Sequence, residues 1–150
     1  MLECTVAELV FKAGADLGAS DWVLVDQARI DSFAEATEDR QWIHVDAARA
    51  ASGPFGATIA HGYLTLSLIA PLLGGLLLVT DASSAINYGL DRVRFPAPVL
   101  VNSRLRAHGS ILKVEAHDGF VQTTLGLSVE SDRSEKPVCI AQSLARFLKS

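Results

Sequence analysis

The sequence predicts an α+β fold in which a long, curved antiparallel sheet wraps around a central apolar helix. Residues 62–80, GYLTLSLIAPLLGGLLLVT, contain no charged side chain, and a helix that is apolar on every side is normally surrounded by protein. The sequence after Asp81 is rich in Val, Ile, Leu, Thr and Phe, often with period-two alternation, which is typical of β-strands. A sheet that curls around the helix would bury its whole circumference.

The first third of the chain predicts short elements joined by loops. Residues 8–13 are typical of the end of an N-terminal helix that stops at Gly14, and residues 22–26, WVLVD, predict a short strand. Asp26 is the N-cap expected for a helix that ends near Thr37, because apolar residues recur after it at helical spacing. The segment EDRQWIH follows this helix directly in the sequence.

A helical turn, a loop and then the strands follow. Asp46 is the N-cap expected for the turn DAARAAS, and GPFGATIAHG is a glycine-rich loop that leads into the apolar helix. The pair Asp118-Gly119 is typical of a hairpin turn. The second half is therefore predicted to be an antiparallel meander of long strands, which are SSAINYGLDRVRFPAP, SRLRAHGSILKVEAHDG, FVQTTLGLSVES and PVCIAQSLARFL.

The length and composition predict a single compact domain. The chain has 150 residues, of which 49% are apolar and 20% charged, so residues 1–150 are expected to form one domain with its own core. An open sheet leaves an edge strand unpaired in a single chain, and pairing of two such edges satisfies both. The architecture therefore predicts a homodimer.

Charge, hydropathy and cysteine content limit the kinds of partner and the cellular compartment that can be expected. The formal net charge is −4 without a basic cluster, so neither nucleic acid nor an anionic membrane is expected as a partner. The apolar segment is long enough to span a bilayer, but Thr65, Ser67 and Pro71 interrupt it, which favours a buried helix. Cys4 and Cys139, far apart in the sequence, predict reduced thiols and a cytoplasmic protein.

The segment TEDRQWIHVD, residues 37–46, holds the candidate site. His44 carries the side chain whose pKa normally lies nearest neutrality, and Asp39 on the same loop could share one water with it. Gly62 opens the apolar helix, where backbone N–H groups have no partner within the helix and could stabilise an oxyanion. A proton-transferring pair and such an amide suit the addition of water across a conjugated carbonyl.

Other interpretations of these residues remain open. A loop aspartate and histidine are more often a cap or a surface pair than a catalytic pair. Asp39, His44 and His61 show no standard metal-ligand spacing, so neither a metal nor another cofactor is predicted, and His61 is expected to have a structural role at the helix start. The motif G-x-S-x-G of a serine hydrolase and the nucleotide-binding motif G-x-G-x-x-G are both absent from the sequence.

Residues 33–68, FAEATEDRQWIHVDAARAASGPFGATIAHGYLTLSL, resemble the hydratase motif of the MaoC-like dehydratases, which include the R-specific enoyl-CoA hydratases. The forms QWIHVD, GPFG and IAHGYLTLSL are most similar to the branch that contains the nodulation protein N-like proteins. Residues 93–99, VRFPAPV, resemble the second recurring segment of this family.

The resemblance implies a hot-dog fold, usually dimeric, that acts on acyl thioesters of coenzyme A in fatty acid metabolism. Asp39 and His44 fall on the catalytic aspartate and histidine, which hold the water, and Gly62 falls on the glycine whose amide binds the thioester oxygen. Gln41 falls where many relatives have an asparagine that helps to order the site. The implied activity is that of an (R)-specific enoyl-CoA hydratase, with coenzyme A as part of the substrate rather than a separate cofactor.

Departures from the family pattern, among them Trp42 in place of a common proline, and two rival functions accompany this resemblance. Glu38 replaces a glycine that often precedes the aspartate and is expected to point to solvent, and Ala70 replaces a serine found in some relatives. The rivals are a hot-dog acyl-CoA thioesterase, which would direct water at the thioester carbonyl, and a non-catalytic acyl-CoA-binding subunit of a heteromeric dehydratase.

The substrate contacts are the least defined part of the site. Phe55, Tyr63 and Arg94 are candidates to bind the substrate. The aromatic residues are expected more readily in the hydrophobic core, and the arginines on a solvated strand face. The core expectation covers Trp22, Phe55, Tyr63, Leu64 and Phe95, and the solvated-face expectation covers Arg92, Arg94 and Arg104.

Overall fold

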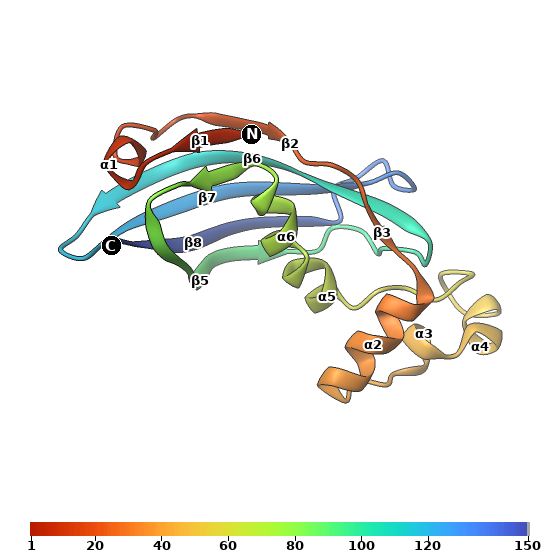
Figure 1. Cartoon of the computed structure of the whole chain (residues 1–150). Coiled ribbons are helices and arrows are strands. Elements are labelled where there is room, and N and C mark those ends of the chain that lie inside the picture. The colour runs from red at the N-terminus through yellow and green to blue at the C-terminus, as the bar shows by residue number, and fades with distance from the viewer. Residues whose placement is uncertain (150) are drawn as a thin grey trace.

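A computed structural model of the chain describes residues 1–149 and shows a long, curved sheet with two short helices against its concave face (Figure 1). Helices α2 to α4 gather at one end of the sheet, and α1, β1 and β4 lie toward the other. The strands are β1 (Leu2–Cys4), β2 (Asp16–Ala19), β3 (Val23–Val25), β4 (Leu77–Val79), β5 (Ala82–Arg94), β6 (Ser103–Ala116), β7 (Phe120–Ser131) and β8 (Cys139–Lys149). The helices are α1 (Val6–Leu9), α2 (Gln27–Thr37), α3 (Trp42–Val45), α4 (Ala47–Ala51), α5 (Gly62–Ser67) and α6 (Ile69–Gly74).

The sheet has the strand order β2-β6-β7-β8-β5, and β3 also pairs with β6. The predicted meander is confirmed for β6, β7 and β8, with a turn at Gly119, whose φ is +84°. The meander prediction is wrong for β5, because this strand pairs with β8 rather than with β6 and forms the edge of the sheet opposite β2. Pro96 and Pro98 lack the N–H that a hairpin ladder needs. The chain between β5 and β6 instead bonds to the loop before α5, through Ala60 N to the Val99 oxygen at 2.8 Å.

The central helix is shorter than predicted. Helix α5 ends at Ser67 and α6 begins at Ile69, whereas the sequence predicted one helix from Gly62 to Thr80. Pro71 has no N–H to donate to the Ser67 carbonyl and its ring clashes with that group, which places the break between them. The segment beyond α6 forms β4, which pairs in parallel with β1. Within residues 1–149, the structure contains no helix with the length and hydropathy to cross a membrane.

The sheet covers one side of these helices rather than their whole circumference. Leu64, Leu68, Ile69 and Leu72 are buried in a cluster with buried residues of β6, β7 and β8, to which β5 adds only the partly buried Ala82 and Val93. On the other side, Ser67 and Ala70 are exposed, because β5 is an edge strand whose side chains are mostly exposed as well. One chain therefore leaves an open flank beside its central helices.

The smaller elements largely confirm the sequence prediction. Strand β3 lies within the predicted strand, and the Asp26 carboxylate caps α2 by accepting a hydrogen bond from Arg29 N at 2.9 Å. Asp46 caps α4 in the same way, through Arg49 N at 3.0 Å. The N-terminal helix was predicted too late in the sequence. Thr5 caps it, α1 ends at Leu9, and the turns that follow lead to Gly14.

Helix α2 ends at Thr37 and is followed by its C-cap, Glu38, a residue with left-handed backbone geometry. Its φ is +62°, and its side chain is exposed, as predicted. For a residue with a Cβ this conformation costs about 1–2 kcal/mol, whereas glycine adopts it freely and is the usual residue at this place. The glycine that often precedes the aspartate in the resembling family therefore suits the backbone better than Glu38 does.

We expect Glu38→Gly to stabilise the fold by about 0.5–1 kcal/mol, because strain is relieved and only part of that gain is lost to the entropy of the unfolded chain. Thermal unfolding at matched protein concentration should show a Tm higher by a few degrees, at about 2–4 °C per kcal/mol. Glu38→Ala is the control, since it removes the carboxylate but keeps the Cβ. Equal stabilisation by alanine would show that charge, not backbone strain, is responsible.

Candidate active site

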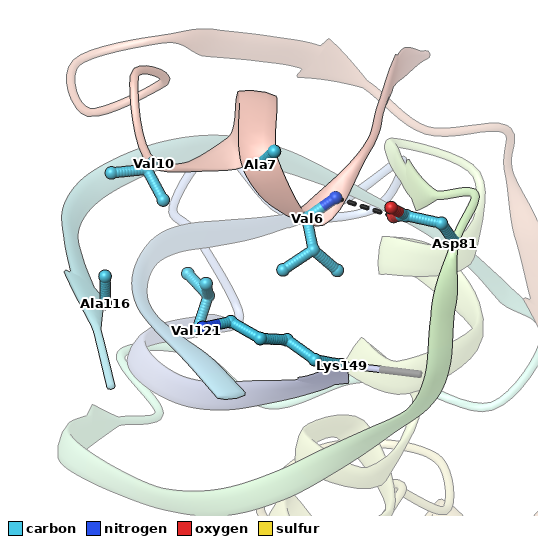
Figure 2. Close-up of a pocket in the computed structure, with 7 residues that line it drawn as sticks. All are labelled: Val6, Ala7, Val10, Asp81, Ala116, Val121 and Lys149. Carbon is cyan, nitrogen blue, oxygen red and sulfur yellow. Dashed lines mark hydrogen bonds between the residues drawn. The ribbon is translucent and has the colours of Figure 1, made fainter. Parts of the chain in front are cut away.

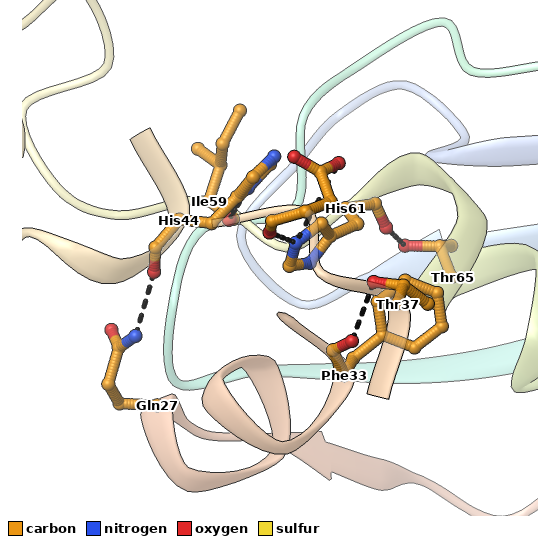
Figure 3. Close-up of polar contacts among 8 residues, drawn as sticks. Gln27, Phe33, Thr37, His44, Ile59, His61 and Thr65 are labelled. Carbon is orange, nitrogen blue, oxygen red and sulfur yellow. Dashed lines mark hydrogen bonds and ion pairs between the residues drawn. The ribbon is translucent and has the colours of Figure 1, made fainter. Parts of the chain in front are cut away.

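Three ionisable side chains meet at the end of the sheet where α2, α3 and the loop before α5 converge (Figure 3). Asp39 follows the end of α2, His44 lies in α3, and His61 immediately precedes α5. One nitrogen or oxygen of each side chain lies within 4.8 Å of the others. The structure thus brings together Asp39 and His44, as the sequence predicted, and adds His61.

His44 is held in one tautomer by the backbone. Its ring is buried, with 6% exposed, and Nδ1 lies 2.6 Å from the carbonyl oxygen of Ile59. A carbonyl oxygen only accepts, so Nδ1 carries the proton and Nε2 keeps its lone pair. Burial is the main cause that lowers the pKa of His44, with a smaller contribution in the same direction from His61. Both effects favour the neutral ring, which is the form that accepts a proton.

His61 orders Asp39, a role that sequence reasoning missed. Its ring is 3% exposed and stacks on His44 with 3.7 Å between ring centroids. Nε2 lies 2.9 Å from the backbone oxygen of Asp39 and 4.0 Å from its carboxylate. His61 is also the N-cap residue of α5, where its backbone oxygen accepts from Thr65 N at 3.1 Å, although its side chain forms no capping hydrogen bond. The one available signal was its place directly before Gly62.

The tautomers of the two histidines weigh against a metal ion. Nε2 of His61 donates to the Asp39 carbonyl, and Nδ1 is buried without a partner. Coordination of an ion by Nε2 would break that bond and require the proton to move to Nδ1. Among residues 1–149, Nδ1 has no hydrogen-bond acceptor. Asp39, whose side chain is 52% exposed, and Nε2 of His44 remain available. A ring nitrogen of His44 lies within 4.8 Å of an Asp39 carboxylate oxygen, and two acceptors that close can share one water at about 2.8 Å from each.

Gly62 lies beside this pair at the start of α5. Its N–H has no acceptor within the described part of the chain, and a Cβ added here would meet the ring of Phe95 at 3.1 Å. A hollow of about 340 Å³ opens next to it, lined by Phe55, Ile59, Ala60, Gly62, Thr65, Phe95, Pro96, Ala97, Pro98, Val99 and Val138. Because α5 has only six residues, the free amide matters more than any helix dipole.

Most of the aromatic residues predicted for the core lie at the surface of the single chain. Tyr63 is 71% exposed and meets Phe95 edge-on, and Phe55, Phe95 and Trp22 are each about two-fifths exposed. Leu64 is buried as predicted. Tyr63 and Phe95 border the open flank left by β5, so no second layer within one chain covers them.

The structure gives the remaining predicted residues no side-chain contact with the pair. Gln41 is exposed and its side chain makes no hydrogen bond among residues 1–149, although its backbone oxygen accepts from His44 N at 2.9 Å. Arg94 is exposed at the end of β5, and Arg104 pairs with Asp132 at 2.9 Å. The roles of Gln41 and Arg94 stay predictions. The amide that does reach α3 belongs to Gln27, which sequence reasoning did not single out.

A second hollow lies away from the histidines, at the end of the sheet near α1 (Figure 2). It has a volume of about 400 Å³ and mostly apolar walls, which include Val6, Val10 and Val121. Lys149 borders it, as does Asp81, whose carboxylate accepts a hydrogen bond from Val6 N at 2.6 Å. No histidine is among the residues that line this hollow, so the cluster of Asp39, His44 and His61 at the other end is the candidate active site.

Comparison with known proteins identifies the family of the chain. Residues 10–132 match the family model of the MaoC like domain. The chain is 50% identical over 145 residues to 3-hydroxyacyl-thioester dehydratase Z of Mycobacterium tuberculosis, with 96% of each chain covered. It is 41% identical over 144 residues to nodulation protein N of Rhizobium leguminosarum bv. viciae, which covers 94% of this chain and 89% of that one.

A solved structure shares the fold. The R-hydratase PhaJ1 from Pseudomonas aeruginosa superposes with a TM-score of 0.73 at 23% sequence identity, and the match covers 92% of this chain and 83% of that one. The predicted α+β hot-dog fold is thereby confirmed. Together, the matched family model and the relatives show that this chain belongs to the MaoC-like dehydratase family.

Proposed function

We propose that this chain is an (R)-specific enoyl-CoA hydratase, a hydro-lyase that reversibly adds water to trans-2-enoyl-CoA thioesters. The observation that carries the proposal is the buried ring of His44, fixed with Nδ1 on the Ile59 oxygen and clustered with Asp39 and His61, the residue directly before the unpaired amide of Gly62. The relative named as a 3-hydroxyacyl-thioester dehydratase, with half of its residues identical, supports the same reaction in the reverse direction.

In the proposed reaction the thioester oxygen accepts a hydrogen bond from Gly62 N, which draws electrons from the conjugated double bond. Asp39 and Nε2 of His44 hold one water, and His44 takes a proton as the water oxygen bonds to the β carbon. The electron pair of the double bond moves toward the α carbon and the thioester oxygen. The proton is then returned to the α carbon, and the product is the (R)-3-hydroxyacyl thioester. Coenzyme A leaves with the product, so no separate cofactor is consumed.

We assign the substrate contacts to residues around the hollow at Gly62. Phe55 lines it, and the exposed Tyr63 stands at its border against Phe95. Arg94 directly precedes Phe95 in the chain, and its exposed guanidinium suits a phosphate of coenzyme A. Gln41 is proposed to order the site only when substrate and water are bound.

We also propose that the protein works as a homodimer joined through β5. This strand of 13 residues is an edge of the sheet, and its exposed apolar side chains include Ile86, Tyr88 and Leu90. A long apolar edge favours pairing with another chain, and two copies related by a two-fold axis can pair the same strand antiparallel. The interface would reach the site, because β5 ends next to Phe95. Two buried, unpaired cysteines support a reducing cytoplasm as its location.

Removal of either proton-transferring group should abolish most of the activity. We expect Asp39→Asn and His44→Ala to lower kcat for hydration of crotonyl-CoA by at least about 100-fold, measured as the loss of enoyl-thioester absorbance. His117→Ala, an exposed histidine near the far hairpin, is the matched control and should keep wild-type activity. Full activity in either site variant would refute the assignment, and release of free thiol without hydration would favour a thioesterase.

The pH dependence should reflect the buried histidine. Hydration requires the neutral ring of His44, so kcat/KM should fall as the pH drops through its pKa. Because burial lowers that pKa, the midpoint of the acid limb should lie below the ordinary histidine value of about 6.5. Initial rates at constant ionic strength provide the measurement. A midpoint above that value would contradict the assigned environment of His44.

Association through β5 is tested by measurement of mass. Light scattering should give twice the 16.0 kDa of one chain. Ile86→Glu should shift the protein toward the monomer, because it places a charge within the paired edges. Leu112→Glu is the control, since Leu112 is similarly exposed but lies on β6, away from that edge. A monomeric wild type, or equal dissociation by both variants, would exclude this interface.

A further inference from the structure

Gln27, the first residue of α2, joins three parts of the site, and Figure 3 shows one of these links, its hydrogen bond to His44. Its Nε2 donates to the backbone oxygen of His44 at 2.8 Å and to the Asp31 carboxylate at 2.8 Å. Its Oε1 accepts a hydrogen bond from the hydroxyl of Thr58 at 2.6 Å. One side chain thus uses both ends of its amide to connect α2, α3 and the loop before α5.

The chemistry of the three partners determines which way the amide points. The backbone oxygen of His44 and the carboxylate of Asp31 only accept, so both must face the NH₂ group. Thr58 is 2% exposed, and its own backbone oxygen is already bonded to Val101 N at 2.9 Å. Its hydroxyl, which can donate or accept, then donates to Oε1, and a flipped amide would lose the bonds to His44 and Asp31.

Gln27 connects α3 with the loop before α5, and the same two segments hold the His44 ring. The ring is attached to the backbone of α3, and the backbone oxygen of His44 accepts a hydrogen bond from Gln27. Nδ1 of the ring bonds to Ile59, the neighbour of Thr58 in the loop. Gln27 therefore sets the separation between the backbone that carries the imidazole and the carbonyl that fixes its tautomer.

We propose that Gln27 is a positioning residue for His44 and acts through its paired contacts with the His44 backbone and Thr58. The inference rests on the proposed function, since it concerns the direction of the Nε2 lone pair that receives the proton from water. Displacement of a reacting group by about 1 Å can cost about 100-fold in rate. Loss of Gln27 is accordingly expected to lower kcat, while KM changes little, because Gln27 does not line the hollow beside Gly62.

Four variants separate the contacts. Gln27→Leu removes all three hydrogen bonds at similar size. Gln27→Glu keeps an acceptor for Thr58 but has no donor for the His44 oxygen, and it adds a negative charge to the surroundings of His44, which already include Asp39 and His61. Thr58→Val deletes the hydroxyl without change of shape, and Thr58→Ser restores it. Gln122→Leu is the matched control, because Gln122 is a half-buried glutamine that bonds to Arg146 on the sheet.

We expect kcat for crotonyl-CoA hydration to fall about tenfold or more in Gln27→Leu and Thr58→Val, within the range seen for small displacements. Thr58→Ser and Gln122→Leu should stay close to wild type. Gln27→Glu should also move the acid limb of the kcat/KM profile to higher pH, because a nearby negative charge raises the pKa of His44. A residue that only stabilised the fold would change Tm but leave kcat of the folded Gln27→Leu and Thr58→Val variants close to wild type.

Proton–nitrogen correlation spectra of the histidine rings give a readout that needs no substrate. Wild-type His44, assigned by comparison with His44→Ala, should show the Nδ1–H tautomer, and Gln27→Leu and Thr58→Val should show a mixture. If the variants show this mixture but the wild-type protein does not hydrate any enoyl thioester, the positioning role stands and the proposed function is rejected. Unchanged His44 shifts with wild-type kcat in folded Gln27→Leu and Thr58→Val would overturn the inference, as would an equal loss of kcat in Gln122→Leu.

Discussion

The hydrogen bond of 2.6 Å from Nδ1 of His44 to the Ile59 carbonyl is the contact on which the site depends. It leaves Nε2 as the only proton acceptor of the ring, and it joins α3 to the loop before α5. That loop is in turn bonded to the crossover between β5 and β6, through Ala60 N to the Val99 oxygen and Val101 N to the Thr58 oxygen. The imidazole is therefore held relative to the sheet, although both segments that carry the site are loops or single helical turns.

The two groups proposed to handle protons sit in contrasting surroundings. His44 is buried under the stacked ring of His61, whereas about half of the Asp39 side chain faces solvent. Pairs of titratable groups in unlike environments are how one site holds an acid and a base at the same pH. His61 links the two, because one face of its ring packs against His44 while its Nε2 holds the Asp39 backbone.

Local features of this protein were predictable from sequence, and long-range ones were not. The Asp26 cap, the span of α2 and the hairpin at Gly119 follow from residue types within a few positions of one another. Asp39, His44 and Gly62 could be placed together because a family pattern joins them. The position of β5 depends on pairing with β8, about 50 residues later in the chain, which alternation alone does not encode.

The missed residues of the site share a physical reason. Gln27 meets Thr58 across 31 positions, and its three bonds depend on the angle at which α2 crosses α3. The direction of the His61 ring likewise depends on Phe33 packing against it at 4.9 Å between centroids. Such directions arise from tertiary packing, whereas spacing in the sequence specifies only which residues are near in the chain.

The contact between Gly62 and Phe95 couples the backbone of the site to the wall of the hollow. The Phe95 ring occupies the space that a side chain at position 62 would need, with a clearance of 3.1 Å from an added Cβ. A methyl group at position 62 would therefore push the ring by a few tenths of an ångström. The shape of the hollow thus depends on the absence of a side chain at its edge as much as on the aromatic ring that lines it.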